Sequence, residues 1–307
     1  MRILFMGTPD FAVPSLEALV TAGHTLCGVF SQPDKPVGRH QNVLQPTPVK
    51  ACAITHDIPV YQPVKLRDGT ALALIEELEP ELIVVAAYGR FLPDEILNYP
   101  AKGCINVHSS LLPKYRGAAP INWAVLNGDA ETGVTIQHMA TEMDTGEIIA
   151  QASTPIDPDE TAETLYSRLA AMGGELLAKA VADIEQGTAT RTPQDGSQMT
   201  LAPLLSKELS PMDWNKSARQ LHNQVRGLIP WPVAVAELNG VRCKVFTTHA
   251  TEESTQKAPG TIIEAGKAGI KIACGGGTVL CINELQADGG KRMTAAAYLA
   301  GHPIQQG

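Results

Sequence analysis

The first half of the chain alternates short apolar runs with segments of helical periodicity. The apolar runs, which are typical of buried strands, cover residues 3–6, 25–30, 81–87 and 104–107. The segments with a helical pattern cover residues 12–22, 48–55, 70–79 and, longer than the others, 159–186. Strands that alternate with helices predict a doubly wound, mostly parallel α/β sheet with helices on both of its faces.

The second half of the chain has a different pattern. After a helix expected over residues 215–226, two strand-like runs at 233–238 and 241–247 flank the dipeptide Asn239-Gly240. Because this dipeptide accepts the positive φ angles of a type I′ turn, it predicts a β-hairpin. Further short strands are expected at 261–264, 270–274 and 278–282. Five short strands so close together predict a small β-barrel, and the strand pattern alone also fits a sandwich.

The length and one compositional change predict the domain organisation. A chain of 307 residues exceeds what one hydrophobic core usually organises, so two domains are expected. Residues 187–203 are rich in Thr, Gln, Gly and Pro, a composition that is typical of a linker. We therefore predict a first domain over residues 1–188, a linker over 189–206 and a second domain over 207–307.

The net charge of -8 is unevenly distributed along the chain. Residues 1–205 contain 13 Lys and Arg against 24 Asp and Glu, whereas residues 206–307 contain 11 against 8. Nucleic-acid phosphates need a basic surface, so the second domain suits such a partner better than the first. The loop 32–50 is a basic exception in the acidic part, with Lys35, Arg39 and Lys50 against Asp34. On charge alone this loop is an ordinary solvated one.

The cysteines and the apolar stretches indicate the cellular compartment in which the protein is expected. The six cysteines are scattered, without a CxxC pair or a His spacing that suits zinc, so we expect reduced, mostly buried thiols and no metal. The apolar run at the amino terminus is too short for a signal peptide, and no stretch approaches the ~20 apolar residues of a membrane span. These patterns predict a cytoplasmic protein without a membrane partner, and they indicate no obligate protein partner.

Three side chains near the middle of the chain form a candidate reactive group. Asn106 and His108 stand two residues apart at the end of an apolar run, and positions i and i+2 of a strand project from the same face. Asp144 adds a carboxylate in a Gly-containing loop. A hydrogen-bond donor, a titratable ring and an acid that orients the ring suit acyl-type transfer. Taken singly, His108 reads as a core histidine, and Asn106 and Asp144 as turn residues.

Two common nucleotide sites are not supported. The strand at the amino terminus leads into Gly7-Thr8-Pro9-Asp10, which lacks the glycines of a dinucleotide site, and Pro9 has no backbone N–H for a phosphate. The sequence GxxxxGK[ST] is absent as well. NAD-dependent and ATP-driven chemistry are therefore disfavoured.

The stretch INVHSSLLPKYRGAAPINW, residues 105–123, followed by MDTGE at 143–147, resembles the folate-dependent formyltransferases. The resemblance implies that Asn106, His108 and Asp144 surround the formyl carbon, and that the second domain resembles an OB-fold. It also implies folate contacts from two segments, which comprise Ser110, Leu111, Leu112 and Pro113, and Ala87, Tyr88, Gly89, Phe91 and Leu92.

Other segments resemble one branch of this family over nearly the whole chain. They are ILFMGTPDFAVPSLEAL at the amino terminus, SQPDKPVGR at 31–39 and PWP at 230–232. This branch moves the formyl group of 10-formyltetrahydrofolate to the α-amine of methionine on initiator tRNA, for translation initiation. The resemblance implies tRNA contacts from Arg39, Lys35 and Lys207. The chain departs from the branch at His40-Gln41-Asn42, where further lysines often stand.

Several alternatives stay open at this point. A formyltransferase that acts on a nucleotide-linked amino sugar also carries a small added domain, whereas a glycinamide ribonucleotide transformylase would lack the last hundred residues. A formyltetrahydrofolate hydrolase would use the same three residues with water as the acceptor. A folate-binding or tRNA-binding module without activity is disfavoured, because Asn106, His108 and Asp144 are all present.

Overall fold

The computed structural model describes residues 1–37 and 43–303, which form two compact units. Unit 1 comprises Met1–Gly117, Thr132–Thr154 and Tyr166–Ala202, and unit 2 comprises Ala118–Glu131, Pro155–Leu165 and Pro203–Gly307. The units are therefore not simply the two halves of the chain. No helix in the described residues is both long and apolar enough to cross a membrane.

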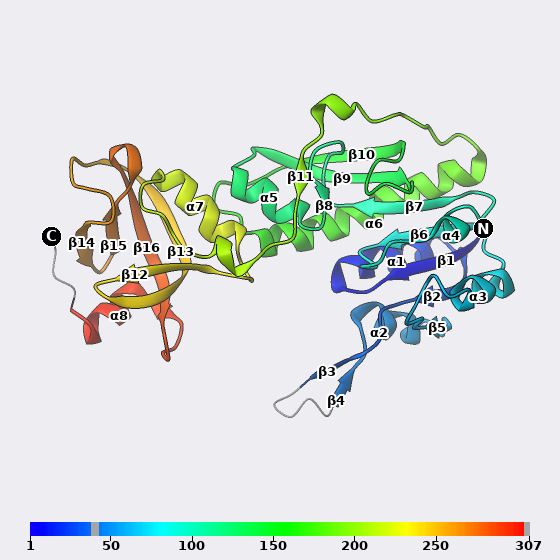
Figure 1. Ribbon diagram of the computed structural model, residues 1–307, viewed down its shortest axis with the longest axis horizontal. Coiled ribbons are helices and arrows are strands. Elements are labelled where there is room, and N and C mark those ends of the chain that lie inside the picture. The colour runs from blue at the N-terminus through cyan, green and yellow to red at the C-terminus, as the bar shows by residue number, and fades with distance from the viewer. Residues whose placement is uncertain (38–42, 304–307) are drawn as a thin grey trace. The chain divides into compact units, whose positions relative to one another are not determined.

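Unit 1 is built on a seven-stranded sheet in the order β10-β9-β7-β6-β1-β2-β5 (Figure 1). Its strands are β1 (Arg2–Gly7), β2 (Thr25–Phe30), β5 (Val60–Tyr61), β6 (Leu82–Ala86), β7 (Cys104–His108), β9 (Glu131–His138) and β10 (Ile148–Pro155). The pairings from β5 through β7 are parallel, and β9 runs antiparallel to β7. The predicted doubly wound, mostly parallel sheet is confirmed, with an antiparallel edge that the sequence pattern did not indicate.

Helices cover both faces of this sheet, as predicted. They are η1 (Asp10–Ala12), α1 (Val13–Thr21), α2 (Pro48–Thr55), α3 (Thr70–Leu78), α4 (Asp94–Leu97) and α6 (Ala162–Gln186). On one face, Leu4 and Met6 share a core with Ile75 of α3. On the other face, the backbone of α6 at Gly173 lies against Val107 and Val134. The side chains that alternate with Val107 along β7 therefore point away from α6.

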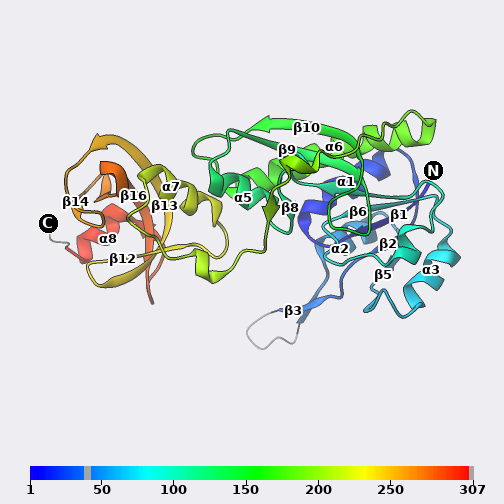
Figure 2. The same cartoon turned by 45° about the horizontal axis from the view of Figure 1, so that its top comes forward.

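Two small ribbons complete unit 1. Strands β3 (Lys35–Val37) and β4 (Val43–Gln45) pair antiparallel and extend away from the seven-stranded sheet in both views (Figures 1 and 2). Strand β11 (Leu201–Ala202) pairs in parallel with β8 (Arg116–Gly117). The segment that composition predicts as a linker also contains η2 (Gly196–Gln198) and, at Thr192, a bridge to Ile148. Its residues therefore pack as part of unit 1 as far as Ala202.

Unit 2 is dominated by one antiparallel sheet in the order β12-β13-β16-β15-β14, with β17 paired to β16. Its strands are β12 (Ala234–Leu238), β13 (Val241–Ser254), β14 (Ile262–Gly266), β15 (Gly269–Ala273), β16 (Thr278–Ala287) and β17 (Met293–Thr294). Asn239 and Gly240 have φ angles of 51° and 77°, so the predicted type I′ hairpin is confirmed. A sandwich needs two sheets, whereas these six described strands belong to one.

The helical elements of unit 2 are α5 (Pro120–Asn127), η3 (Lys207–Leu209), α7 (Ala218–Gly227), η4 (Gly275–Gly277) and α8 (Ala295–Gly301). Helix α7 begins with a capping box, because Ser217 and Gln220 satisfy each other's backbone N–H groups. It packs on α5, where the Asn122 side chain donates to the Gly227 carbonyl over 2.8 Å. The packing of α5 on α7 places residues 118–131 in unit 2.

Candidate active site

The site is built where β7 ends. Strand β7 includes His108, one residue beyond the predicted strand. Its register places Asn106 between Val85 of β6 and Gln137 of β9, and His108 beside Thr135. Asn106 and His108 therefore project from the face that points away from α6, as their spacing predicts. The carboxyl end of a parallel sheet is also where ligands of doubly wound folds bind.

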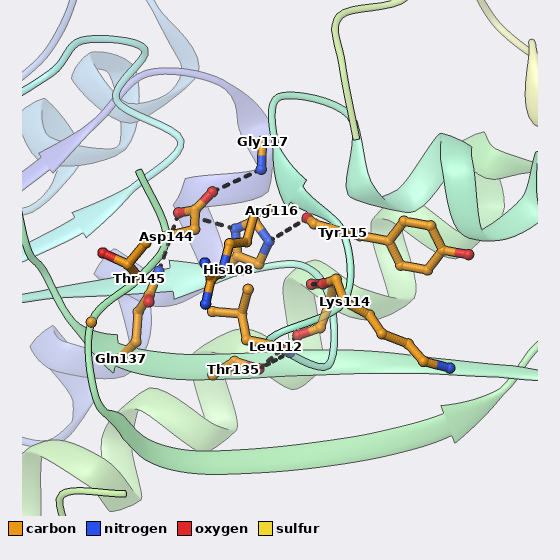
Figure 3. Close-up of polar contacts among 12 residues, drawn as sticks. His108, Leu112, Lys114, Tyr115, Arg116, Gly117, Thr135, Gln137, Asp144 and Thr145 are labelled. Carbon is orange, nitrogen blue, oxygen red and sulfur yellow. Dashed lines mark hydrogen bonds and ion pairs between the residues drawn. The ribbon is translucent and has the colours of Figure 1, made fainter. Parts of the chain in front are cut away.

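His108 is held at both ring nitrogens (Figure 3). It is 5% exposed, its Nε2 lies 2.9 Å from the carbonyl oxygen of Tyr115, and its Nδ1 lies 3.6 Å from Oδ1 of Asp144. A carbonyl oxygen only accepts hydrogen bonds, so Nε2 carries the proton that it donates to Tyr115. The other nitrogen faces a carboxylate. The ring therefore lies between a neutral carbonyl, to which it donates, and a charged carboxylate, which it faces.

Asp144 is oriented by the backbone and by the neighbouring strand. Its Oδ2 accepts the N–H of Gly117 over 2.9 Å, and its Oδ1 accepts Nε2 of Gln137 over 3.1 Å (Figure 3). Its backbone has a φ of 56°, in the left-handed region that aspartate tolerates better than most residues. These contacts aim the carboxylate at His108.

Gly117 supplies the N–H for Asp144 from a crowded position. Its φ is 126°, and a Cβ there would lie 2.6 Å from the carbonyl oxygen of Ala202. Only glycine combines this φ with so close an approach. The pairing of β8 with β11 thus presents the Gly117 N–H to the carboxylate.

Asn106 differs from its two neighbours in the site. Its side chain is partly exposed, and within the described residues it has no hydrogen-bond or ion-pair partner. An amide has two donor hydrogens and an acceptor oxygen. These groups are therefore available to a substrate at the end of β7.

The predicted folate-contacting segment at residues 87–92 follows β6, directly beside the end of β7. The parallel pairing of Ala86 with Val107 brings the two strand ends together. Ala87 and Gly89 are exposed with positive φ angles, Phe91 is 65% exposed, and Leu92 is buried. The Tyr88 side chain instead lies in the core of unit 1, and its carbonyl accepts from Thr8 and Gln32.

The other predicted folate segment, residues 110–113, forms a tight turn above β9. Thr135 holds this turn, since its hydroxyl donates to the Ser110 carbonyl over 2.7 Å and accepts the Leu112 N–H over 3.1 Å. The Ser110 hydroxyl is buried and donates to the Lys114 carbonyl over 2.6 Å. Leu112 is buried, and Leu111 and Pro113 are half-buried. Ser110 therefore shapes the turn rather than facing solvent.

The three predicted tRNA contacts fall in different places. Lys35 is exposed on β3, and Lys207 is exposed in η3 of unit 2. Arg39 lies outside the described residues. Lys50, which contributed to the basic character of the loop, has its charge paired with Asp34 over 2.6 Å.

The structure adds residues that the sequence pattern did not single out. Gln137 and Thr135 alternate along β9 and hold Asp144 and the 110–113 turn. The alternation in TGVTIQH, residues 132–138, is the signal that could have marked them as one face of a strand. Gln194 bonds to the backbone of the Asp144 loop from the predicted linker, where no pattern distinguishes it.

One cluster within the described residues has the composition of a metal site. Glu17, Cys52 and His56 bring their ligand atoms within 4.8 Å of one another. The Cys52 thiol donates to Oε1 of Glu17 over 3.1 Å, and Nε2 of His56 lies 2.9 Å from Oε2. Burial and the Glu17 carboxylate raise the pKa of the Cys52 thiol to about 12. In this arrangement the three side chains hydrogen-bond one another.

Comparison with protein families agrees with this geometry. The model of the formyl transferase family matches residues 1–181, and that of the formyl transferase C-terminal domain matches residues 204–303. In solved structures, an N-formyltransferase from Helicobacter canadensis in complex with folinic acid and dTDP-3-aminofucose has a TM-score of 0.70 at 20% identity, covering 92% of this chain and 98% of that one. HypX from Aquifex aeolicus in complex with tetrahydrofolic acid has a TM-score of 0.64 at 18% identity, covering 100% and 48%. At such identities the likeness shows the fold.

Curated relatives are much more similar in sequence. The methionyl-tRNA formyltransferase of Trichlorobacter lovleyi is 48% identical over 100% of this chain and 96% of its own length. That of Acetivibrio thermocellus is 47% identical over 100% of this chain and 98% of its own length. With both family models matched in order and identity sustained over the full length, the chain belongs to the methionyl-tRNA formyltransferase family of folate-dependent enzymes.

Proposed function

We propose that the protein transfers the formyl group of 10-formyltetrahydrofolate to the α-amino group of methionine on initiator methionyl-tRNA. The observation that carries this proposal is the arrangement at the end of β7, where Asn106, which has no polar partner among residues 1–37 and 43–303, stands beside a His108 that faces Asp144. Relatives that share nearly half of the sequence bear the corresponding name. We place this activity in the cytoplasm, where translation begins.

The reaction requires a group that stabilises negative charge on the formyl oxygen. As the amine adds to the formyl carbon, a C–N bond forms and the oxygen gains charge. The Asn106 amide is suited to donate to this oxygen, and the loss of one such donor typically costs about 100- to 1000-fold in rate. The bond to the folate nitrogen then breaks, and that nitrogen gains a proton while the former amine loses one.

His108 is the group suited to assist these proton movements. Its Nε2 proton is donated to the Tyr115 carbonyl, and its Nδ1 faces Asp144. A substrate oxygen or nitrogen that reaches Nε2 has to share this proton with the Tyr115 carbonyl or take the place of that carbonyl as the acceptor. The carboxylate of Asp144 faces Nδ1, so it attracts the positive charge that the ring acquires whenever it accepts a second proton. We assign Asp144 this electrostatic and orienting role.

The folate co-substrate would lie against the wall formed by residues 87–92 and the turn 110–113. Phe91 is 65% exposed and follows the strand beside β7, so its ring is available to pack on a flat ring of the co-substrate. Exposed backbone at Ala87 and Gly89 can bond the ring edge. Ser110 and Tyr88 would act indirectly, because their side chains are turned inward and shape the two segments.

The charge distribution supports a nucleic-acid acceptor. Residues 206–307, which hold 11 Lys and Arg against 8 Asp and Glu, are the basic part of unit 2, and Lys207 is exposed there. Lys35 is exposed on the β3–β4 ribbon, and we propose Arg39 as a further phosphate contact of that loop. We accordingly propose residues 1–188 as the catalytic domain, 189–206 as the connecting segment and 207–307 as the tRNA-binding domain.

The deciding experiment follows a labelled formyl group. The protein is incubated with 10-formyltetrahydrofolate labelled in the formyl carbon and, separately, with initiator methionyl-tRNA, elongator methionyl-tRNA, a nucleotide-linked amino sugar, or water alone. The proposal expects label on methionine of the initiator tRNA, and His108→Ala should remove it. Label on the amino sugar, or free formate as the main product, would assign the protein to a different reaction.

A further inference from the structure

The segment from Thr192 to Ala202, here named the strap, contacts the active site at several points. At one end, Thr192 exchanges two backbone hydrogen bonds with Ile148, over 2.8 and 2.9 Å. At the other end, β11 pairs with β8. Between these anchors lie two polar side chains, Gln194 and Thr200, whose hydrogen bonds reach the groups around His108 and Asp144.

Gln194 holds the loop of Asp144. Its Nε2 lies 2.8 Å from the carbonyl oxygens of both Asp144 and Gly146, and 3.2 Å from Oε1 of Gln137. Its Oε1 accepts from Nε and Nη2 of Arg116 over 3.1 and 2.7 Å. The Arg116 guanidinium thus fixes the orientation of the Gln194 amide. The amide hydrogens then point to the carbonyls of the Asp144 loop and to Gln137, the β9 residue that bonds the Asp144 carboxylate.

Thr200 holds the backbone at Tyr115 and Arg116. Its hydroxyl accepts the Tyr115 N–H over 2.9 Å, and its carbonyl accepts the Arg116 N–H over 2.9 Å. Tyr115 supplies the carbonyl that binds His108, and Gly117 supplies the N–H that binds Asp144. The same short segment therefore restrains both partners of the histidine ring and both partners of the carboxylate.

We propose that the strap is a positioning element of the active site, in which Gln194 fixes Asp144 and Thr200 fixes the Tyr115–Gly117 backbone. The proposal rests on the proposed function, since it assigns the strap to the same His108–Asp144 pair. Gln194 is a positioning residue, because its contacts run through Asp144, Gly146 and Gln137. A displacement of reacting groups by ~1 Å can cost about 100-fold in rate.

The first test compares two glutamines of the strap in the full-length protein. Gln194→Ala should lower kcat by about 10- to 100-fold with KM for both substrates within about twofold. Gln194→Glu should lose as much, because a carboxylate keeps the Arg116 contact and cannot donate to the carbonyls. Gln198→Ala is the matched control, since the Gln198 amide donates to Asp195 within the strap, and it should retain normal kcat. Equal kcat for Gln194→Ala and wild type would overturn the proposal.

The second test separates positioning from general damage. When Asp144 is already replaced by alanine, there is no carboxylate for Gln194 to position. Adding Gln194→Ala should then lower the residual activity by less than about twofold. A merely structural role would lower activity by the same factor in both backgrounds, and that result would overturn the proposal.

The third test does not depend on the substrate. The imidazole nitrogen resonances of His108, assigned by their loss in His108→Ala, should shift in Gln194→Ala and stay in place in Gln198→Ala. If wild type transfers no formyl group to methionyl-tRNA while these resonances respond as expected, the proposed function fails and the strap's structural action stands. Unchanged resonances in Gln194→Ala would overturn the strap proposal even if the enzyme is active.

Discussion

Asn106 and His108 stand two residues apart on one strand, and their surroundings differ in kind. His108 is buried between the Tyr115 carbonyl and the Asp144 carboxylate, and Asp144 is in turn held by Gly117 and Gln137. Within the described residues, the Asn106 side chain has no polar partner at all. The described residues thus supply polar partners for His108 and leave the hydrogen-bonding groups of Asn106 to the substrate.

The difference separates two ways of preparing a group for catalysis. A ring that donates to a carbonyl from one nitrogen and faces a carboxylate with the other keeps its orientation before substrate arrives, so no reorganisation is needed during the reaction. An amide without a partner on the protein gains its hydrogen bond only when the substrate supplies an acceptor. The first arrangement contributes to stability and to activity, whereas the second contributes chiefly to activity. Each variant below tests one side of this distinction.

The largest effect is expected for His108→Ala. Removing the general acid or base typically costs ~100- to 10,000-fold in rate. The Tyr115 carbonyl also loses its donor, so the free energy of unfolding should fall by about 1–3 kcal/mol. Formyl transfer and urea denaturation measure the two effects. His56→Ala is the control, because His56 bonds Glu17 at an exposed position of unit 1 and should leave turnover intact.

Asn106→Ala should separate activity from stability. We expect kcat to fall by about 100- to 1000-fold through the lost oxyanion donor. Because no protein partner is left unpaired, the free energy of unfolding should change by less than about 0.5 kcal/mol. A loss of stability as large as that of His108→Ala would show that the comparison between the two residues is mistaken.

Gly117→Ala tests whether the Asp144 carboxylate depends on one backbone position. The added methyl group meets the Ala202 carbonyl in a backbone conformation that alanine rarely adopts. We expect a loss of about 1–3 kcal/mol of stability and a reduction of kcat of about 10-fold as the N–H moves away from the carboxylate. Gly196→Ala has open space around it and serves as the control. Normal kcat for Gly117→Ala would mean that Gln137 alone suffices to orient Asp144.

The smallest effect is expected for Phe91→Ala, at the open wall beside the strand end. The side chain is mostly exposed, so stability should be nearly unchanged. If the folate ring covers it, the loss of roughly 1 kcal/mol of apolar burial should raise KM for 10-formyltetrahydrofolate about fivefold, with kcat retained. An unchanged KM would remove Phe91 from the folate wall.

Where the apolar pattern was strong, the sequence predicted the fold closely. The observed bounds of β2 and α2 agree with the predicted ones, since an unbroken apolar run and a Thr47 cap with Pro48 after it define their limits. Strands β9 and β10 were not predicted. The alternation in residues 132–138 is a local signal for β9, whereas its antiparallel pairing with β7 is encoded by no local pattern.

The site itself was predictable only in part. Asn106 and His108 follow from a local spacing, because two residues of one strand have a fixed relation. Gln194 could not be found in this way, since a glutamine among Thr, Gln, Gly and Pro has the composition of a linker. Its role comes from the pairing of residues near 116 with residues near 201. That contact is a property of the folded chain.

The packing of α5 on α7 joins two segments that the ribosome makes at different times. α5 ends at Asn127 and α7 begins at Ala218. Synthesis of the roughly 90 residues between them takes about 5–20 s at common ribosomal rates. During this interval Asn122 has no Gly227 carbonyl to bind, and the α7-facing side of α5 stays uncovered on the nascent chain. Leu126 of α5, which lies against Gly227 in the folded protein, is then accessible to a chaperone that binds apolar helix surfaces during translation.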